Sequence, residues 1–298
     1  MEYLTVREPR LARRFFDRFE PVHAVTYFSP ESRAAFDALG FRGFWMGYFA
    51  GRSAPLGVVP PEVVTAMFYN FAPSRVAKAL PAAWDVATPA SALRAREDSA
   101  VATLRRYGLS DERAGAAADL AAKAARHAPL DGRPLFAANA ALPWPSDPVA
   151  RLWHATTLLR EQRGDAHVAV LASSGLSGRE CNVLHAAAGR VPAEMIMRSR
   201  DYDEEQWRGH QNRLAERGLL DGHGALTDAG RALKLHIEDT TDALSLSALD
   251  ALDDGEVEAL FRDLTPITRM VVAAGDVPAA TPMGLCREDL DDDSAHLG

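Results

Sequence analysis

The chain has 298 residues, of which 47% are hydrophobic and 25% are charged, a balance typical of a globular protein with one large domain or two ordinary ones. Its charged N-terminal segment differs from a secretory signal, and no apolar stretch is long enough to span a membrane, so we expect a cytoplasmic protein that does not associate with membranes. The net charge of -8 weighs against a broadly electropositive surface, and two cysteines, Cys181 and Cys286, are too few for a zinc site of several thiolates.

The first part of the chain predicts a mainly α protein, because apolar residues recur there at helical spacing. Serine and aspartate caps, prolines and glycines mark the expected helix boundaries, and Pro81 is expected to end one helix. We therefore expect an N-terminal helical domain over residues 1–128. Its predicted helices cover residues 10–19, 30–39, 60–70, 73–80, 90–107 and 111–127.

The middle of the chain begins with a proline-rich stretch, residues 129–147, which we interpret as a linker. A helix is predicted from Pro148, with Asp147 as its cap, to about residue 162. Gly164 is expected to break this helix before a shorter one begins. Ser177 and Glu180 have the spacing of a capping box and predict a further helix over 178–188.

The C-terminal part has the element order of a winged helix-turn-helix over about residues 190–245. Two predicted helices precede two short apolar pieces around Gly222 and Gly224, which predict a small β-hairpin, and Thr227 then caps another helix. This module lies within a predicted helical region over 148–276. The remaining residues, 277–298, are acidic, and we expect them to be disordered.

The segment RLAERGLLDGHGALTDAG resembles the wing region of winged-helix proteins of the MarR type. The whole chain is similar to an actinobacterial family described as helix-turn-helix or MarR-like. Three stretches carry this similarity: HAVTYFSPE, GRSAPLGVVPPEVVTAMFYNFAP and LREQRGDAHVAVLASSGLSGRECNVLHAAAG. The resemblance implies a helix-turn-helix fold with a winged helix, and it implies no established chemistry. The MarR-type positions are Leu214, Arg217, Gly218, Leu219, Leu226, Thr227 and Gly230.

Duplex DNA is a partner that this fold would allow but that the local charge disfavours. Affinity for DNA depends largely on Lys and Arg that neutralise phosphates, whereas the start of the predicted recognition helix reads DYDEE from residue 201. The predicted wing contains Asp221 and His223 but no Lys or Arg. DNA binding therefore rests on fold analogy. Its candidate residues are Arg198, Arg200, Arg208 and Arg213.

The densest cluster of ionisable residues lies in LREQRGDAHVAVL, residues 159–171. In one interpretation Glu161, Arg163, Asp165 and His167 form a ligand site together with His185 on the next helix. His154, His167 and His185 would then be candidate metal ligands, although their spacing matches no known metal motif. In the alternative interpretation, which we favour, Arg160, Glu161 and Arg163 are solvated charges at a helix end and Asp165 caps the next helix.

Two further segments contain candidate ligand-binding residues. His23 and Tyr27 are four positions apart and would form a pair on a helix, although Pro21 leaves the helix there undecided. Arg52 lies on a predicted loop and could bind a carboxylate or phosphate beside aromatic residues such as Tyr48. For both segments the structural alternative is ordinary core packing.

From these features we expect a winged-helix protein that binds a small molecule and acts as a transcriptional regulator. Its ligand would lie where Arg52, the His23–Tyr27 segment and the turn from Glu161 to His167 meet. The alternative is an enzyme on the same scaffold that uses histidine and carboxylate side chains as a base, or as ligands of a metal or haem. The sequence identifies no cofactor. A homodimer is a further expectation, since winged-helix proteins are often dimers.

Overall fold

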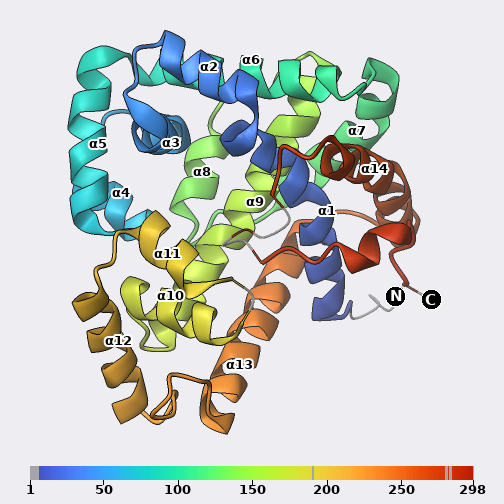
Figure 1. The fold of residues 1–298 in the computed structure, drawn as a ribbon. Coiled ribbons are helices and arrows are strands. Elements are labelled where there is room, and N and C mark those ends of the chain that lie inside the picture. The colour runs from blue at the N-terminus through green and yellow to red at the C-terminus, as the bar shows by residue number, and fades with distance from the viewer. Residues whose placement is uncertain (1–6, 190, 279–280, 282–283, 298) are drawn as a thin grey trace.

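The computed structural model describes residues 7–189, 191–278, 281 and 284–297, and this part of the chain is mainly α-helical, as predicted (Figure 1). None of the helices described is long and apolar enough to cross a membrane. The α-helices are α1 (Pro9–Phe28), α2 (Pro30–Ala38), α3 (Gly43–Ser53), α4 (Pro61–Phe68), α5 (Pro73–Val86), α6 (Pro89–Arg106), α7 (Asp111–His127), α8 (Pro134–Ala140), α9 (Pro148–Ser173), α10 (Gly178–Ala187), α11 (Ala193–Arg200), α12 (Glu204–Glu216), α13 (Asp228–Ser245) and α14 (Asp254–Ala274).

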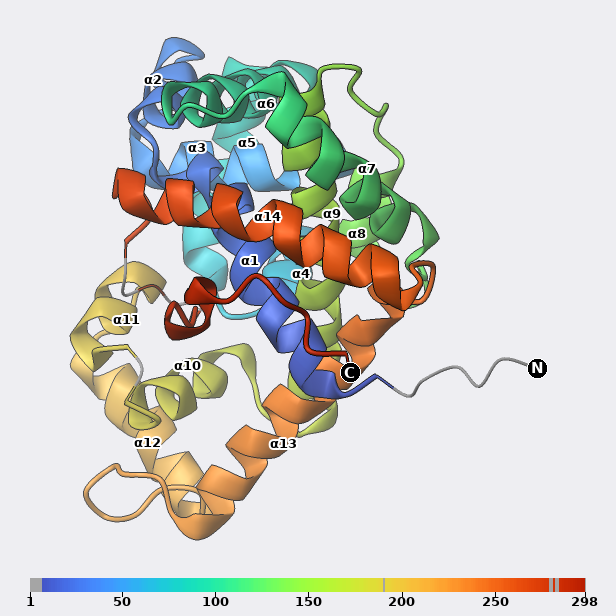
Figure 2. The same ribbon diagram turned by 90° about the vertical axis from the view of Figure 1, so that its right-hand side faces the viewer.

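The long helix α9 runs through the middle of a helical body and packs against α1, α6, α7, α8 and α13. Figure 2 shows α14 lying across α1, which it contacts together with α7. One apolar core joins these elements, with Phe15 of α1, Leu158 of α9 and Leu264 of α14 all buried in it. Residues distant in sequence therefore share this core. It includes Phe136 of α8, inside the stretch interpreted as a linker, and Ala295, inside the acidic C-terminal stretch.

Three helices continue through residues that were expected to limit them. α1 continues past Pro21, α5 past Pro81 and α9 past Gly164, so the predicted break in α9 is wrong. A glycine inside a helix costs about 1 kcal/mol relative to alanine, and a proline costs about 3 kcal/mol. Burial of apolar side chains on both sides outweighs these costs, since each fully buried large side chain contributes roughly 1.5–3 kcal/mol. In α9, Leu152, Trp153, Leu158 and Leu171 supply such burial.

We call α10, α11, α12 and the first half of α13 the helix-turn-helix segment, because the helix-turn-helix predicted over about residues 190–245 falls largely within them. This segment extends from the helical body at the bottom of Figure 1. It has its own apolar core, which includes Leu184, Ile196, Trp207, Leu214 and Ile237. The predicted capping box of Ser177 and Glu180 begins α10, as expected.

The predicted β-hairpin is wrong: the described residues contain no β-strand, and only an isolated antiparallel bridge joins Leu220 to Leu226. The intervening residues form a tight turn in which the Asp221 carboxylate accepts hydrogen bonds from the backbone N–H groups of His223 and Ala225. Thr227 immediately caps α13 by accepting from the N–H of Gly230. The turn and the cap together occupy the residues that a longer strand pair would need.

The helix-turn-helix segment contacts the helical body at the residues between α4 and α5. Tyr69 has a φ of 54°, and its hydroxyl donates to the carbonyl of Leu176 just before α10. The Asn182 amide donates to the carbonyl of Asn70 at 2.8 Å. A Cβ atom on Gly178 would lie 1.8 Å from the carbonyl oxygen of Tyr69, so only glycine permits this close approach.

We expect Gly178→Ala to lower the free energy of unfolding by about 1–3 kcal/mol, because the added methyl group forces the two backbones apart. Gly115→Ala, in the second turn of α7, is the matched control, since a Cβ there meets nothing within 4 Å. The control should raise stability by up to about 1 kcal/mol. Urea unfolding of both variants measures the difference. If both variants were more stable than the wild type by the same amount, the close contact between Gly178 and Tyr69 would be contradicted.

Candidate functional site

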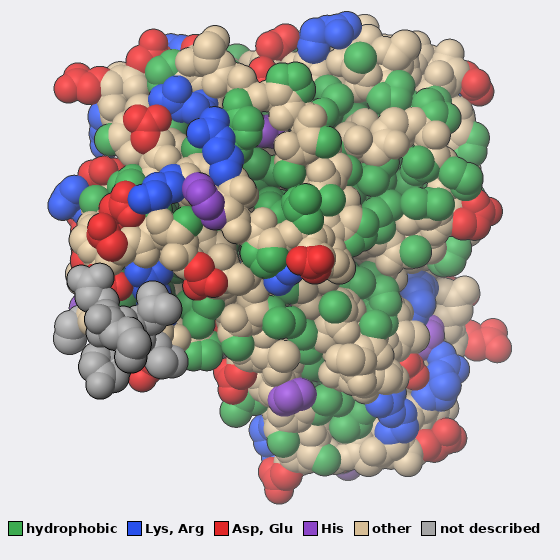
Figure 3. Space-filling view, turned by 180° about the vertical axis from the view of Figure 1, so that it is seen from behind, with side chains coloured by type: hydrophobic (Ala, Val, Ile, Leu, Met, Phe, Trp, Pro, Cys, Tyr) green, Lys and Arg blue, Asp and Glu red, His purple; other side chains and the backbone are tan. Residues whose placement is uncertain are grey.

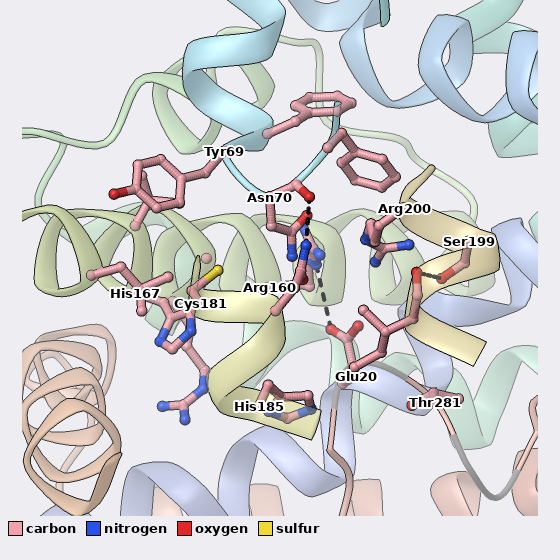
Figure 4. A pocket seen from close by; sticks show the side chains of 18 of the residues that line it. Glu20, Tyr69, Asn70, Arg160, His167, Cys181, His185, Ser199, Arg200 and Thr281 are labelled. Atoms are coloured by element: carbon pink, nitrogen blue, oxygen red, sulfur yellow. Dashed lines mark hydrogen bonds and ion pairs between the residues drawn. The ribbon is translucent and has the colours of Figure 1, made fainter. Parts of the chain in front are cut away.

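A cavity of about 490 Å³ lies between the helical body and the helix-turn-helix segment (Figure 4). Its walls come from α1, α3, α4 and α9 on one side and from α10, α11 and α13 on the other. Many of the wall residues are aromatic, and they include Tyr27, Trp45, Tyr48, Phe68 and Phe71. A volume of this size suits a small organic molecule, since ligand pockets commonly measure about 300–1,000 Å³.

A buried ion network lies beside the cavity in the middle of α9. Arg52 of α3 donates two hydrogen bonds to the Glu161 carboxylate, from Nε and Nη2, each 3.2 Å long. Arg160 Nη1 donates to the same carboxylate at 2.8 Å. Although burial alone would raise it, the guanidinium groups of Arg160 and Arg52 hold the pKa of Glu161 far below its usual range. The network is therefore charged, and it fixes α3 against α9.

Glu20 of α1 is fully buried and lines the cavity, and neither of its carboxylate oxygens has a hydrogen bond within the described residues. Its nearest cation is Arg160, whose Nε lies 3.7 Å from Oε2 (Figure 4). Burial raises the pKa of Glu20 to about 7, against the opposing charge of Arg160. The group can therefore gain or lose a proton close to neutral pH.

Arg200, the last residue of α11, contributes a guanidinium group to the cavity lining (Figure 4). This group lies 4.2 Å from the ring centroid of Phe71, and its buried Nε has no hydrogen-bond partner among the described residues. Burial lowers the pKa of Arg200, but arginine remains protonated at any ordinary pH. The cavity lining thus includes a cation whose guanidinium N–H groups can donate hydrogen bonds to a ligand.

The predicted pair of His23 and Tyr27 is formed, because α1 continues through this segment. His23 Nε2 lies 2.9 Å from the Tyr27 hydroxyl, and its Nδ1 lies 2.9 Å from the Thr157 hydroxyl on α9. Burial lowers the pKa of His23 well below its usual value, so the ring is neutral at pH 7. Tyr27 reaches the cavity, whereas His23 lies behind it.

The structure separates the candidate ligand-binding residues into two groups. Those that line the cavity are Tyr27, Tyr48, Arg52, Arg163, His167 and His185. Those that lie outside its wall are His23, Glu161 and Asp165. Asp165 accepts a hydrogen bond at 2.9 Å from the N–H of Phe136 at the start of α8, and burial raises its pKa to about 6. It caps α8 rather than the second helix that the sequence predicted.

The three histidines proposed as metal ligands do not converge. His167 and His185 both line the cavity, but His154 packs edge-on against Trp144, with ring centroids 4.8 Å apart, and is absent from the cavity wall. The described part of the chain contains no group of three or more His, Cys, Asp or Glu residues that could hold a metal ion. His167 Nδ1 lies 3.0 Å from the Thr241 hydroxyl, and burial lowers the pKa of His167 to about 4.

Sequence reasoning did not assign to a ligand site three charged residues that line the cavity, namely Glu20, Arg160 and Arg200. The interpretation of Arg160, Glu161 and Arg163 as solvated charges is wrong, since only 2% of Glu161 and 5% of Arg163 are exposed. Arg200 was a candidate for DNA contact, but its side chain lines the cavity. The sequence prediction ended this helix near residue 162 and so placed Arg160 at a solvated helix end. In the structure α9 continues to Ser173, and Arg160 lies in the middle of the helix.

The other arginines considered for DNA contact, Arg198, Arg208 and Arg213, are exposed. Arg208 lies 3.7 Å from Glu204, and Arg213 lies 3.6 Å from Glu180, so acidic side chains partly neutralise both. Asp201, before α12, pairs with Arg75 of α5 at 2.8 Å and holds the start of this helix close to the body. On the face in Figure 3, acidic and basic side chains are interspersed over the helix-turn-helix lobe at the bottom.

The raised pKa of Glu20 predicts a pH-dependent effect on stability. Between pH 4.5 and 7 the folded chain holds a proton on Glu20 that the unfolded chain releases, so this group lowers stability as the pH rises through that window. Relative to Glu20→Gln, the wild type should lose up to about 3 kcal/mol between pH 4.5 and pH 8. Urea unfolding of both proteins across this range measures the difference. A constant difference would mean that Glu20 keeps an ordinary pKa.

Comparison with known proteins gave one result. A family model described as a helix-turn-helix family matches residues 12–278. No curated protein and no solved structure matches the chain significantly. The matched residues include both the helical body and the helix-turn-helix segment, and they cover most of the sequence. The chain therefore belongs to this helix-turn-helix family.

Proposed function

We propose that this protein binds a small organic molecule in the cavity between its helical body and its helix-turn-helix segment, and that it acts as a regulator of transcription. One observation carries the proposal: the cavity wall is shared by the body helices α1, α3 and α9 and by α10, α11 and α13 of the helix-turn-helix segment. A molecule in this position contacts both parts at once.

This shared wall supplies a mechanism for regulation. A ligand shifts a conformational equilibrium only by binding one state more tightly than another. Because its contacts extend over both parts, a ligand here favours the arrangement in which both walls fit it. The contacts of Tyr69 with Leu176 and of Arg75 with Asp201 are the ones that such a shift would alter.

In this proposal α12 is the helix that meets DNA, and the turn over residues 219–227 takes the place of a wing. Asp203, Glu204 and Glu205 at the start of α12 are exposed and oppose the approach of phosphates. We therefore expect weak DNA affinity for the protein without its ligand.

Ligand binding in the cavity can be tested with 1-anilinonaphthalene-8-sulfonate, an aromatic dye with one sulfonate group. Its fluorescence rises in apolar surroundings. Ser199 lines the cavity, and Ser199→Trp would fill part of it. We expect this variant to bind the dye at least about tenfold more weakly than the wild type. Ser199→Ala is the matched control and should bind as the wild type does. Equal binding by all three proteins, each folded by circular dichroism, would place the dye elsewhere and contradict the proposal.

The role of α12 can be tested by reversing its N-terminal charge. Glu204→Lys with Glu205→Lys should raise affinity for random duplex DNA at low salt by about tenfold or more, and should steepen the salt dependence. Glu62→Lys with Asp85→Lys changes the net charge equally on exposed positions of α4 and α5 and is the control. Fluorescence anisotropy across a salt series measures both. Equal effects of the two double variants would show that α12 is not the DNA-facing element.

A further inference from the structure

The class of molecule that fits the cavity can be inferred from the polar groups left in its wall. This inference rests on the proposed function, since it requires that the cavity binds a ligand. Two side chains decide it, Glu20 and Arg200, which lie on different parts of the lining and come from α1 and α11 (Figure 4).

Nearly every cation that lines the cavity has a carboxylate partner. Arg52 and Arg160 share Glu161, Arg163 lies 2.5 Å from Asp242, Arg13 lies 3.3 Å from Asp17, and Lys234 pairs with Glu238. Arg200 differs from these cations, because among the described residues it forms no ion pair and its guanidinium only lies over the Phe71 ring. Arg200 is half-buried, and a partly desolvated charge without a counter-ion favours an anionic group on a ligand.

Glu20, in contrast to Arg200, lacks a hydrogen-bond donor. Its carboxylate is fully buried, faces the cavity and accepts no hydrogen bond from the described residues. Arg160 is 3.7 Å away and already donates to Glu161, so it does not satisfy Glu20. Buried polar groups in folded proteins are almost always hydrogen-bonded, and an exception at a cavity wall points to a partner that the ligand brings. That partner is a hydrogen-bond donor.

Much of the rest of the cavity wall is apolar and aromatic. Trp45, Tyr48, Phe68 and Phe71 contribute rings to the wall, and the centroids of Tyr48 and Phe71 are 5.5 Å apart. Aromatic walls of this kind favour flat, unsaturated ligands that stack against them edge-on or offset. A volume of about 490 Å³ admits a molecule of two or three fused rings.

We propose that the cavity binds a flat aromatic molecule with two polar ends: an anionic group that pairs with Arg200 and a hydrogen-bond donor, such as a hydroxyl, that Glu20 accepts. Arg160 holds the Glu20 carboxylate in place as the donor approaches. A molecule with only one of these groups leaves either Arg200 or Glu20 without its partner.

Naphthalene derivatives separate the two polar contributions. The probes are 2-naphthoate, which has only the anion, 2-naphthol, which has only the donor, and the 5-, 6- and 7-hydroxy-2-naphthoates, which have both at different spacings. Isothermal titration calorimetry with the full-length protein measures each affinity. We expect at least one hydroxynaphthoate to bind about tenfold or more tightly than both 2-naphthoate and 2-naphthol.

Substitutions then assign each contribution to its residue. Glu20→Met keeps the side-chain size and removes the acceptor, so it should abolish the preference for the hydroxynaphthoate while 2-naphthoate binds as well as before or better. Arg200→Met should weaken both naphthoates about tenfold and leave 2-naphthol unchanged. Arg208→Met, at an exposed arginine of α12, is the matched control and should change nothing.

Two outcomes would overturn this inference. In the first, no hydroxynaphthoate exceeds 2-naphthoate in affinity for the wild type. In the second, the preference persists in Glu20→Met, which would assign the donor to another acceptor. Binding of 1-anilinonaphthalene-8-sulfonate by the same variants reports whether the cavity is intact. If the hydroxynaphthoates show no preference but the dye binds in the cavity, only the proposed ligand class is contradicted. If the wild type binds the dye no better than Ser199→Trp does, the proposed function itself is contradicted.

Discussion

The arrangement of the site depends on one buried carboxylate, Glu161, in the middle of α9. It accepts hydrogen bonds from Arg52 of α3 and from Arg160 of its own helix, and Arg160 in turn lies beside Glu20 of α1. Taking these charges out of water is expensive, and a buried pair of this kind often adds little net stability. Its effect is positional: the carboxylate fixes α1, α3 and α9 at the distances that leave a cavity between them and the helix-turn-helix segment.

The continuity of α9 makes this network available. The same helix contributes Trp153 to the core of the body, Glu161 to the ion network and Leu171 to the core of the helix-turn-helix segment. A continuous helix with Gly164 in its interior keeps these three positions in fixed register. Gly164 also lines the cavity, where the absence of a side chain leaves space beside Arg160. The residue that looked like a helix break therefore contributes to the shape of the site.

Contact between the helix-turn-helix segment and the body is close and polar. Gly178 lets α10 approach the carbonyl of Tyr69, while Asn182 and Arg75 satisfy backbone and side-chain groups across the junction. This close junction limits how freely the start of α12 can move relative to the helical body. In the proposed function, the acidic start of α12 and this junction both oppose the approach of α12 to DNA, whereas the cavity offers a ligand a wall that both parts share.

The sequence by itself determined the helical class, many helix boundaries and the helix-turn-helix order, because these depend on local periodicity, caps and the capping box of Ser177 and Glu180. It also singled out Arg52, Tyr27 and His167, which line one cavity. The helix continuations through Pro21, Pro81 and Gly164 depended on distant packing that outweighs a local helix penalty. Only the tertiary structure decided that Glu20 and Arg200 share that cavity, and that Glu161 is buried against Arg52. These relations join residues far apart in the chain, and no spacing along one helix encodes them.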